Sequence, residues 1–159
     1  MVTRPAAPLP AMPAMSAACS PSSFIRAFMR GDMRTYVALV RHGEEYTLMA
    51  PSGGEPRRGF DASDEALDAL AQFFRGGEAE LDVFQTYASG DIAVLVAVER
   101  QHGVVGGLPD QDWSLRVTLV FRRERSGWRL VHRHADPLVH EITHEQVGAL
   151  ARGDASAMS

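Results

Sequence analysis

The chain lacks lysine and asparagine altogether, and all 16 basic side chains among its 159 residues are arginines. A GC-rich coding sequence is a sufficient explanation, because the codons of both missing residues begin with two adenines. The absence of lysine nevertheless excludes a Schiff base, a pyridoxal phosphate anchor and a P-loop lysine. The absence of asparagine excludes an N-glycosylation acceptor.

Cysteine, surplus positive charge and long apolar runs are also scarce. The single cysteine, Cys19, excludes an internal disulfide framework and cysteine-based zinc sites. A net charge of -4, with acids and arginines interspersed, argues against a nucleic-acid partner. No apolar run reaches the length of a membrane span, so we expect a cytoplasmic protein without a membrane partner. A hydrophobic content of 45% is enough for one packed core.

Composition divides the chain into three parts. Residues 1–19 are rich in Ala, Pro and Met, which predicts a disordered or loosely packed arm, although a misassigned start codon would also explain them. Residues 20–140 have the patterning of one folded domain. Residues 141–159 are expected to form a short helix and a tail.

The hydrophobic period changes from helical to alternating along the domain. It predicts helices over 24–29, 33–40 and 66–74, the last one stopped by Gly76-Gly77, and strands over 45–50, 79–88, 92–100, 113–123 and 128–136. The strand at 92–100 is apolar on both faces and should be central, and the Gly-rich segment 102–111 is expected to be a loop. Helices followed by a long antiparallel meander predict an α+β fold with the helices on one sheet face.

Several of these features coincide with a known family. They are the break at Gly31-Asp32 between two helices, the turn Pro51-Ser52-Gly53-Gly54, the hairpin Ser89-Gly90-Asp91 and the closing run WRLVHRHAD at 128–136. Together they resemble the nuclear-transport-factor-2-like superfamily in its SnoaL-like branch. The closing run is also similar to the association domain of calcium/calmodulin-dependent kinase II.

The resemblance implies a cone-shaped, curved antiparallel sheet of the cystatin-like kind, wrapped around the N-terminal helices and enclosing an apolar pocket. Members include ketosteroid isomerase, dehydratases, polyketide cyclases and modules without any chemistry, so the fold does not decide the function. Members usually pair through the open sheet face. We therefore expect a homodimer, built on the face that carries Arg129, Val131 and Arg133.

The candidate catalytic residues cluster in the last strand. His132, His134 and Asp136 are spaced by two, so their side chains share one face. A two-residue turn at Ser126-Gly127 would place them opposite Phe121 and other apolar residues, in the pocket, and we favour this register. A bulged turn would place them beside Arg116 and Thr118 instead. In the pocket, the imidazoles would suit acid-base catalysis, with Asp136 orienting His134. The alternative is a structural role in the core or at a dimer face.

Two charged residues of the central strands are further candidates. Glu99 follows seven apolar residues, and a buried carboxylate there could act as a proton shuttle. It could equally form an ion pair with Arg100 or Arg116. Arg116 could bind a carboxylate or enolate oxygen of a substrate, or be a solvated strand residue.

The remaining candidates would contact the substrate. A tyrosine hydroxyl can stabilise an oxyanion, and Tyr36 and Tyr87 are placed for this role unless they are core residues. Trp113 and Phe121 share a predicted apolar strand face. Only Glu44 or Glu45 roughly matches the catalytic aspartate of ketosteroid isomerase, which puts steroid isomerisation in doubt. Two histidines and an aspartate could bind zinc, but two-residue spacing on one strand is a cramped arrangement for three ligands, so no metal is expected.

Taken together, the sequence predicts a protein that binds a small apolar or aromatic molecule in its pocket. The first hypothesis is a cofactor-free isomerase, cyclase or dehydratase that acts on a carbonyl compound by acid-base catalysis. The alternative is a non-catalytic ligand-binding or dimerisation module of the same fold.

Overall fold

A computed structural model describes residues 22–154 and 156 of the chain. The arm predicted at 1–19, with Cys19, lies outside these residues. The described part contains the helices α1 (Ser22–Arg30), α2 (Met33–Leu39), α3 (Asp64–Phe73) and α4 (His144–Ala151). Its strands are β1 (His42–Met49), β2 (Arg57–Arg58), β3 (Phe74–Ser89), β4 (Ile92–Val105), β5 (Leu108–Asp112), β6 (Leu115–Glu124) and β7 (Gly127–Pro137).

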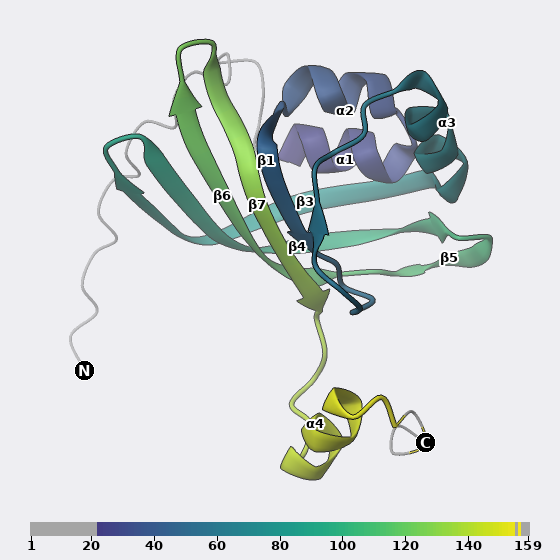
Figure 1. Cartoon of the computed structure of the whole chain (residues 1–159). Helices are drawn as coiled ribbons and strands as arrows, with labels where there is room; N and C mark the ends of the chain where they lie inside the picture. Colours follow the sequence, from purple (N-terminus) through teal and green to yellow (C-terminus); the bar gives the residue numbers. More distant parts are fainter. Residues whose placement is uncertain (1–21, 155, 157–159) are drawn as a thin grey trace.

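The strands form one curved sheet with the order β2-β1-β7-β6-β4-β3, and β5 pairs with β4. Figure 1 shows α1, α2 and α3 on the concave side of this sheet, and α4 beyond the end of β7. The predicted α+β fold is confirmed, but the sheet is mixed rather than antiparallel, because β1 runs parallel to β7. The long connection between these two strands, which contains all the other strands, makes a parallel pairing possible.

The segment 102–111 is not the predicted loop. It forms the end of β4 and the start of β5, and Gly106 and Gly107 between them have φ angles of 59° and 82°. Positive φ at two successive residues is the geometry of a tight hairpin turn, which glycines adopt without strain. The glycines therefore mark a turn between two strands.

Local signals explain where the helices begin, but one predicted helix end was wrong. Ser63 caps α3 by accepting a hydrogen bond from the backbone N–H of Ala66 at 3.3 Å. The helix then ends at Phe73, and Gly77 lies within β3. A Cβ at Gly77 would lie 2.3 Å from the carbonyl oxygen of His102 and 3.0 Å from that of Met29. Glycine is needed there because β3 lies so close to β4 and α1.

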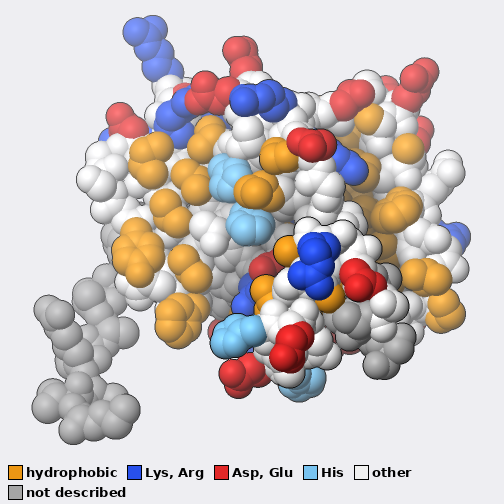
Figure 2. Space-filling model, turned by 60° about the horizontal axis from the view of Figure 1, so that its bottom comes forward, with side chains coloured by type: hydrophobic (Ala, Val, Ile, Leu, Met, Phe, Trp, Pro, Cys, Tyr) orange, Lys and Arg blue, Asp and Glu red, His pale blue; other side chains and the backbone are white. Residues whose placement is uncertain are grey.

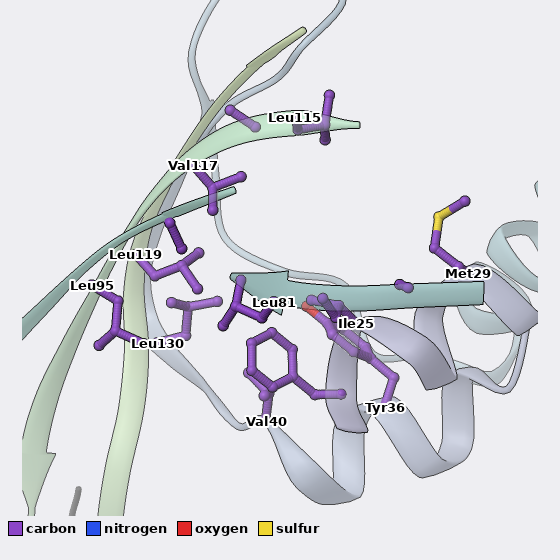
Figure 3. Packing of buried hydrophobic residues seen from close by; sticks show 14 of the residues in the cluster. Ile25, Met29, Tyr36, Val40, Leu81, Leu95, Leu115, Val117, Leu119 and Leu130 are labelled. Carbon is purple, nitrogen blue, oxygen red and sulfur yellow. The ribbon is translucent and has the colours of Figure 1, made fainter. Parts of the chain in front are cut away.

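The core fills the space between the helices and the concave sheet face (Figure 3). Tyr36 of α2 and Ile25 of α1 face strand residues such as Leu81 and Leu119, and Leu119 is fully buried. Residues that face the core alternate with residues that face outward along β4 and β6. Some of the outward residues are apolar, and their side chains lie on the convex side of the sheet.

A bulge in β7 decides which side chains of that strand face the core. Phe121 pairs with Leu130, whereas the neighbouring Val120 pairs with His132, so Val131 is an extra residue. A bulge of one residue exchanges the two faces of the strand beyond it. Leu130 and Arg133 consequently both point inward, although they are three positions apart.

A second bulge changes the end of β3. Val83 pairs with Ala97 and Gln85 with Val96, so Phe84 is the extra residue and is exposed. Tyr87 then pairs with Val94 and shares the convex face with it. None of the helices in the described part of the chain combines the length and the apolarity that crossing a membrane requires.

Candidate functional site

A buried ion pair lies on the concave side of the sheet. Arg133 of β7 donates from Nη1 to Oε1 of Glu99 at 2.5 Å and from Nη2 to Oε2 at 2.7 Å. The Glu99 side chain is 2% exposed and that of Arg133 is 19% exposed. Glu99 lies on β4 opposite Leu115, and Arg133 lies opposite Leu119. The arginine therefore reaches diagonally across β6, and its fork geometry matches the carboxylate.

An aromatic group lies between α2, β1 and the segment that follows β2. The ring of His42 stacks on that of Phe60 with centroids 3.8 Å apart and an angle of 6° between the planes. The edge of Tyr46 contacts the same imidazole at 4.6 Å between centroids. The Tyr36 hydroxyl and His42 Nε2 are 3.2 Å apart, so one of them donates a hydrogen bond to the other. These contacts fix the orientation of the imidazole.

Burial keeps this group uncharged at neutral pH. It lowers the pKa of His42 to about 4, and the positive charge of Arg133 acts in the same direction. Burial also raises the pKa of Tyr46 to about 12 and that of Tyr36 above its ordinary value. For Arg133 burial acts to lower the pKa, but the charge and hydrogen bonds of Glu99 raise it. The charged pair therefore stays ionised while the rings beside it stay neutral.

Two adjoining depressions open beside His42. One, of about 400 Å³, is lined by Val37, Val40, Arg41, His42, Gly43, Glu44, Gly59, Phe60, Ala62 and Arg129. The other, of about 410 Å³, shares His42, Gly43, Glu44 and Arg129 and adds Glu45, Arg122 and Glu124. The first is bordered by the aromatic group and the second mainly by charged residues. Together they have an apolar end and a polar end.

The favoured register of β7 was wrong. The pocket position predicted for His132, His134 and Asp136 was therefore wrong as well. His132 pairs with Val120, His134 with Thr118 and Asp136 with Arg116, so all three face the convex side. The cause is the bulge at Val131, which no turn signal in the sequence marks. His132 Nδ1 lies 2.8 Å from Thr47 Oγ1 on β1.

The other predicted site residues divide between the two sides of the sheet. Tyr36 and Glu99 belong to the concave interior, but the partner of Glu99 is Arg133 and neither Arg100 nor Arg116. Phe121 and Trp113 are half-buried against the core, and Trp113 Nε1 donates to the Gly103 carbonyl at 3.0 Å. Tyr87 is 59% exposed on the convex face, and Arg116 lies there with Asp136 at 2.8 Å. The structure therefore separates these candidates instead of bringing them together.

Sequence reasoning missed four residues of the interior group, namely His42, Tyr46, Phe60 and Arg133. Strict alternation of side chains along the last strand predicted Arg133 on the dimer face. The bulge at Val131 turns Arg133 to the concave side instead. His42 is the first residue of β1, and Phe60 follows a strand of two residues, so neither falls within a segment that the sequence predicted. Within residues 22–154 and 156, no group of three His, Cys, Asp or Glu side chains is arranged to hold a metal ion.

A family model described as the SnoaL-like domain matches residues 22–140, which is most of the chain. No curated protein sequence matches it significantly. Solved structures of similar fold are numerous. A proposed dehydratase of the nuclear-transport-factor-2-like family from Streptomyces avermitilis is 24% identical with a TM-score of 0.58, over 74% of this chain and 89% of that one.

Two further structures extend the comparison. A nuclear-transport-factor-2-like superfamily protein from Salmonella enterica is 21% identical with a TM-score of 0.60, over 78% of this chain and 92% of that one. A proposed calcium/calmodulin-dependent protein kinase type II association domain from Thiobacillus denitrificans is 20% identical with a TM-score of 0.56, over 73% and 90%. At these identities the comparisons establish the fold, and the fold is shared by proteins described in different terms.

The buried ion pair predicts an unequal response to single and double substitution. Glu99→Gln should lower the free energy of unfolding by about 3 kcal/mol, because it leaves the Arg133 charge without its partner. Replacing both residues, Glu99→Leu with Arg133→Met, should recover most of that loss. Urea denaturation measures both. Asp82→Asn, in the exposed pair with Arg100 at 3.6 Å, is the control and should cost less than about 1 kcal/mol. Equal losses for Glu99→Gln and Asp82→Asn would contradict the assignment.

The neutral His42 predicts that stability falls in mild acid. An unfolded imidazole takes up a proton near pH 6.5, whereas the folded one does so near pH 4, so the unfolded state binds more protons between these values. Lowering the pH from 7.5 to 5.0 should therefore cost about 2 kcal/mol through this residue. The His42→Gln variant should lack that part of the pH dependence in urea titrations. An identical pH dependence in both proteins would show that His42 is not buried in its neutral form.

Proposed function

We propose that this chain, which belongs to the SnoaL-like domain family, binds a small apolar or aromatic molecule that carries a neutral polar group. The observation that carries the proposal is the stacked pair of His42 and Phe60 at the wall of a depression of about 400 Å³, with the buried Tyr36 hydroxyl holding His42 from behind. Apolar walls with a few fixed polar groups are typical of small-molecule sites. A flat ligand would extend the stack of His42 on Phe60.

The electrostatics of the wall favour an uncharged functional group on the ligand. His42 is neutral at pH 7 because its pKa is about 4, and burial keeps the Tyr36 hydroxyl protonated. The neutral imidazole of His42 can form a hydrogen bond with a carbonyl or a hydroxyl group without adding a charge to the site, while Tyr36 holds its Nε2. A ketone or an alcohol therefore fits this end of the depression.

A second candidate function is proton transfer on the same ligand without a cofactor. One observation favours it: Glu44 lines both depressions, is exposed, and has no ion-pair partner within the described part of the chain. Such a carboxylate could take a proton from a bound carbonyl compound, as an isomerase or a dehydratase requires. Glu99 is less suited to this step, because both of its oxygens accept hydrogen bonds from Arg133.

We further propose that the chain forms a homodimer through the convex face of the sheet, as a cytoplasmic protein. The half-buried valines Val94, Val96, Val98 and Val120 lie on this face, and Tyr87 and Ile92 extend it at the hairpin between β3 and β4. Figure 2 shows hydrophobic side chains gathered around two histidines. The similarity in fold to a proposed kinase association domain is consistent with this use of the face. Arg133, which the sequence placed there, faces the core instead.

A fragment screen tests the binding proposal. The library consists of aromatic and alicyclic ketones with their corresponding alcohols, and ligand-observed NMR identifies the strongest binder, which then serves as the probe. Tyr36→Phe should weaken its binding about tenfold, because the hydrogen bond that fixes the His42 imidazole, worth about 1.4 kcal/mol, is lost. Tyr87→Phe, on the convex face, is the matched control and should leave the dissociation constant unchanged.

Two outcomes would contradict the proposal, and a third decides the second candidate. No binder in the library, or equal effects of Tyr36→Phe and Tyr87→Phe, would rule out this site. If the protein also converts the probe, Glu44→Gln should abolish turnover while the probe still binds. Full turnover by Glu44→Gln would exclude Glu44 as the base.

A further inference from the structure

Two histidines lie in the middle of the convex face. His132 and His134 belong to β7, the third strand of six in the main order, and they share the outward pleats of their neighbours. From β1, Thr47 and Met49 lie beside them, and from β6, Val120 and Thr118. The half-buried valines of β4 continue the face beyond β6. The two imidazoles are thus surrounded by apolar or uncharged side chains.

Most charged residues of this face lie at its margins and are paired in place. Two that have no ion pair among the described residues are Arg58 of β2, beside Thr47, and Glu80 of β3, opposite Arg100. On one side of the histidines, Arg122 of β6 bonds to Glu45 of β1 and, at 2.9 Å, to Glu124. On the other side, Arg116 of β6 bonds to Asp136 of β7 at 2.8 Å. On the outer strands, Arg100 pairs with Asp82 at 3.6 Å. These pairs leave His132 and His134 as the groups near the centre of the face that can change charge in mild acid.

From this arrangement we infer that the convex face is a self-association surface that opens on acidification, with His132 and His134 as its sensors; the inference rests on the proposed homodimer. A second copy is the partner that fits, because most fixed charges of the face are neutralised within each chain, and the two that are not, Arg58 and Glu80, have opposite signs and lie on the two end strands of the main order. Two identical faces can therefore meet without repulsion at neutral pH. A two-fold interface places the same patch on both subunits.

Protonation of His132 and His134 would turn this neutral contact into a repulsive one. Each copy would gain up to two positive charges at the centre of the interface, and the same charges would face each other across the two-fold axis. The carboxylates nearest the histidines, Glu45, Glu124 and Asp136, are engaged by Arg122 and Arg116, so they offer little compensation. A charge that is desolvated in an interface without a partner weakens binding strongly. The dimer should therefore dissociate between pH 7.5 and pH 5.0.

Sedimentation equilibrium of the full chain at pH 7.5 and pH 5.0 tests the inference. The dissociation constant of the wild-type dimer should rise at least about tenfold at pH 5.0, with far-UV circular dichroism showing that the fold persists. The double variant His132→Gln with His134→Gln should dimerise equally at both pH values, because glutamine keeps a hydrogen-bonding group for Thr47 without titrating. His102→Gln, at the hairpin between β4 and β5, is the control and should respond to pH as the wild type does.

The outcomes separate the two proposals. A wild-type dimer whose dissociation constant is the same at both pH values would overturn the acid response while leaving the homodimer in place. A chain that is monomeric at pH 7.5 would overturn the homodimer itself, and the inference with it. Val96→Glu, which puts a charge on β4 in line with His134 and separated from it by Thr118, should prevent dimerisation at both pH values. Unchanged dimerisation of Val96→Glu would show that another surface is used.

Discussion

The bidentate pair between Glu99 and Arg133 is the interaction on which the rest of the structure depends. An arginine can extend from β7 to β4 only if it points to the concave side, and the bulge at Val131 turns it there. The same bulge turns His132 and His134 to the convex side. One local irregularity thus supplies both the charged centre of the interior and the histidines of the outer face.

The ion pair also governs the electrostatics around it. It places a positive charge near His42, which adds to burial in keeping this imidazole neutral, and it occupies the most deeply buried carboxylate of the described chain. The wall of the depression of about 400 Å³ therefore combines apolar side chains with the neutral imidazole of His42, while the charges that have no ion pair within the described structure are at Arg41 and Glu44. Because the wall is neutral and Glu99 is held by Arg133, we propose binding of an uncharged molecule ahead of catalysis by an interior acid.

The sequence predicted most of the fold, because the period of the helices and strands, their caps and their turns are local signals. Gly77 and the Gly106-Gly107 turn were misjudged, since close backbone approach and hairpin pairing depend on distant segments. Glu99 was recognised as an interior candidate, because a carboxylate that ends an apolar strand is visible within one segment. Tyr36 was recognised because it lies in a predicted helix of the same domain. The partner of Glu99 and the faces of His132 and His134 could not be predicted, because a bulge reverses strand parity without a sequence mark.

The central claim is that β7 is bulged at Val131, which turns Arg133 inward and the two histidines outward. Nuclear Overhauser contacts between the backbone protons of β6 and β7 test it directly and do not depend on ligand or oligomeric state. The account predicts that Thr118 lies directly opposite His134 and Arg116 directly opposite Asp136. Direct pairing of Leu119 with His134 and of Val117 with Asp136 would contradict it, because the histidines would then share the interior with Glu99.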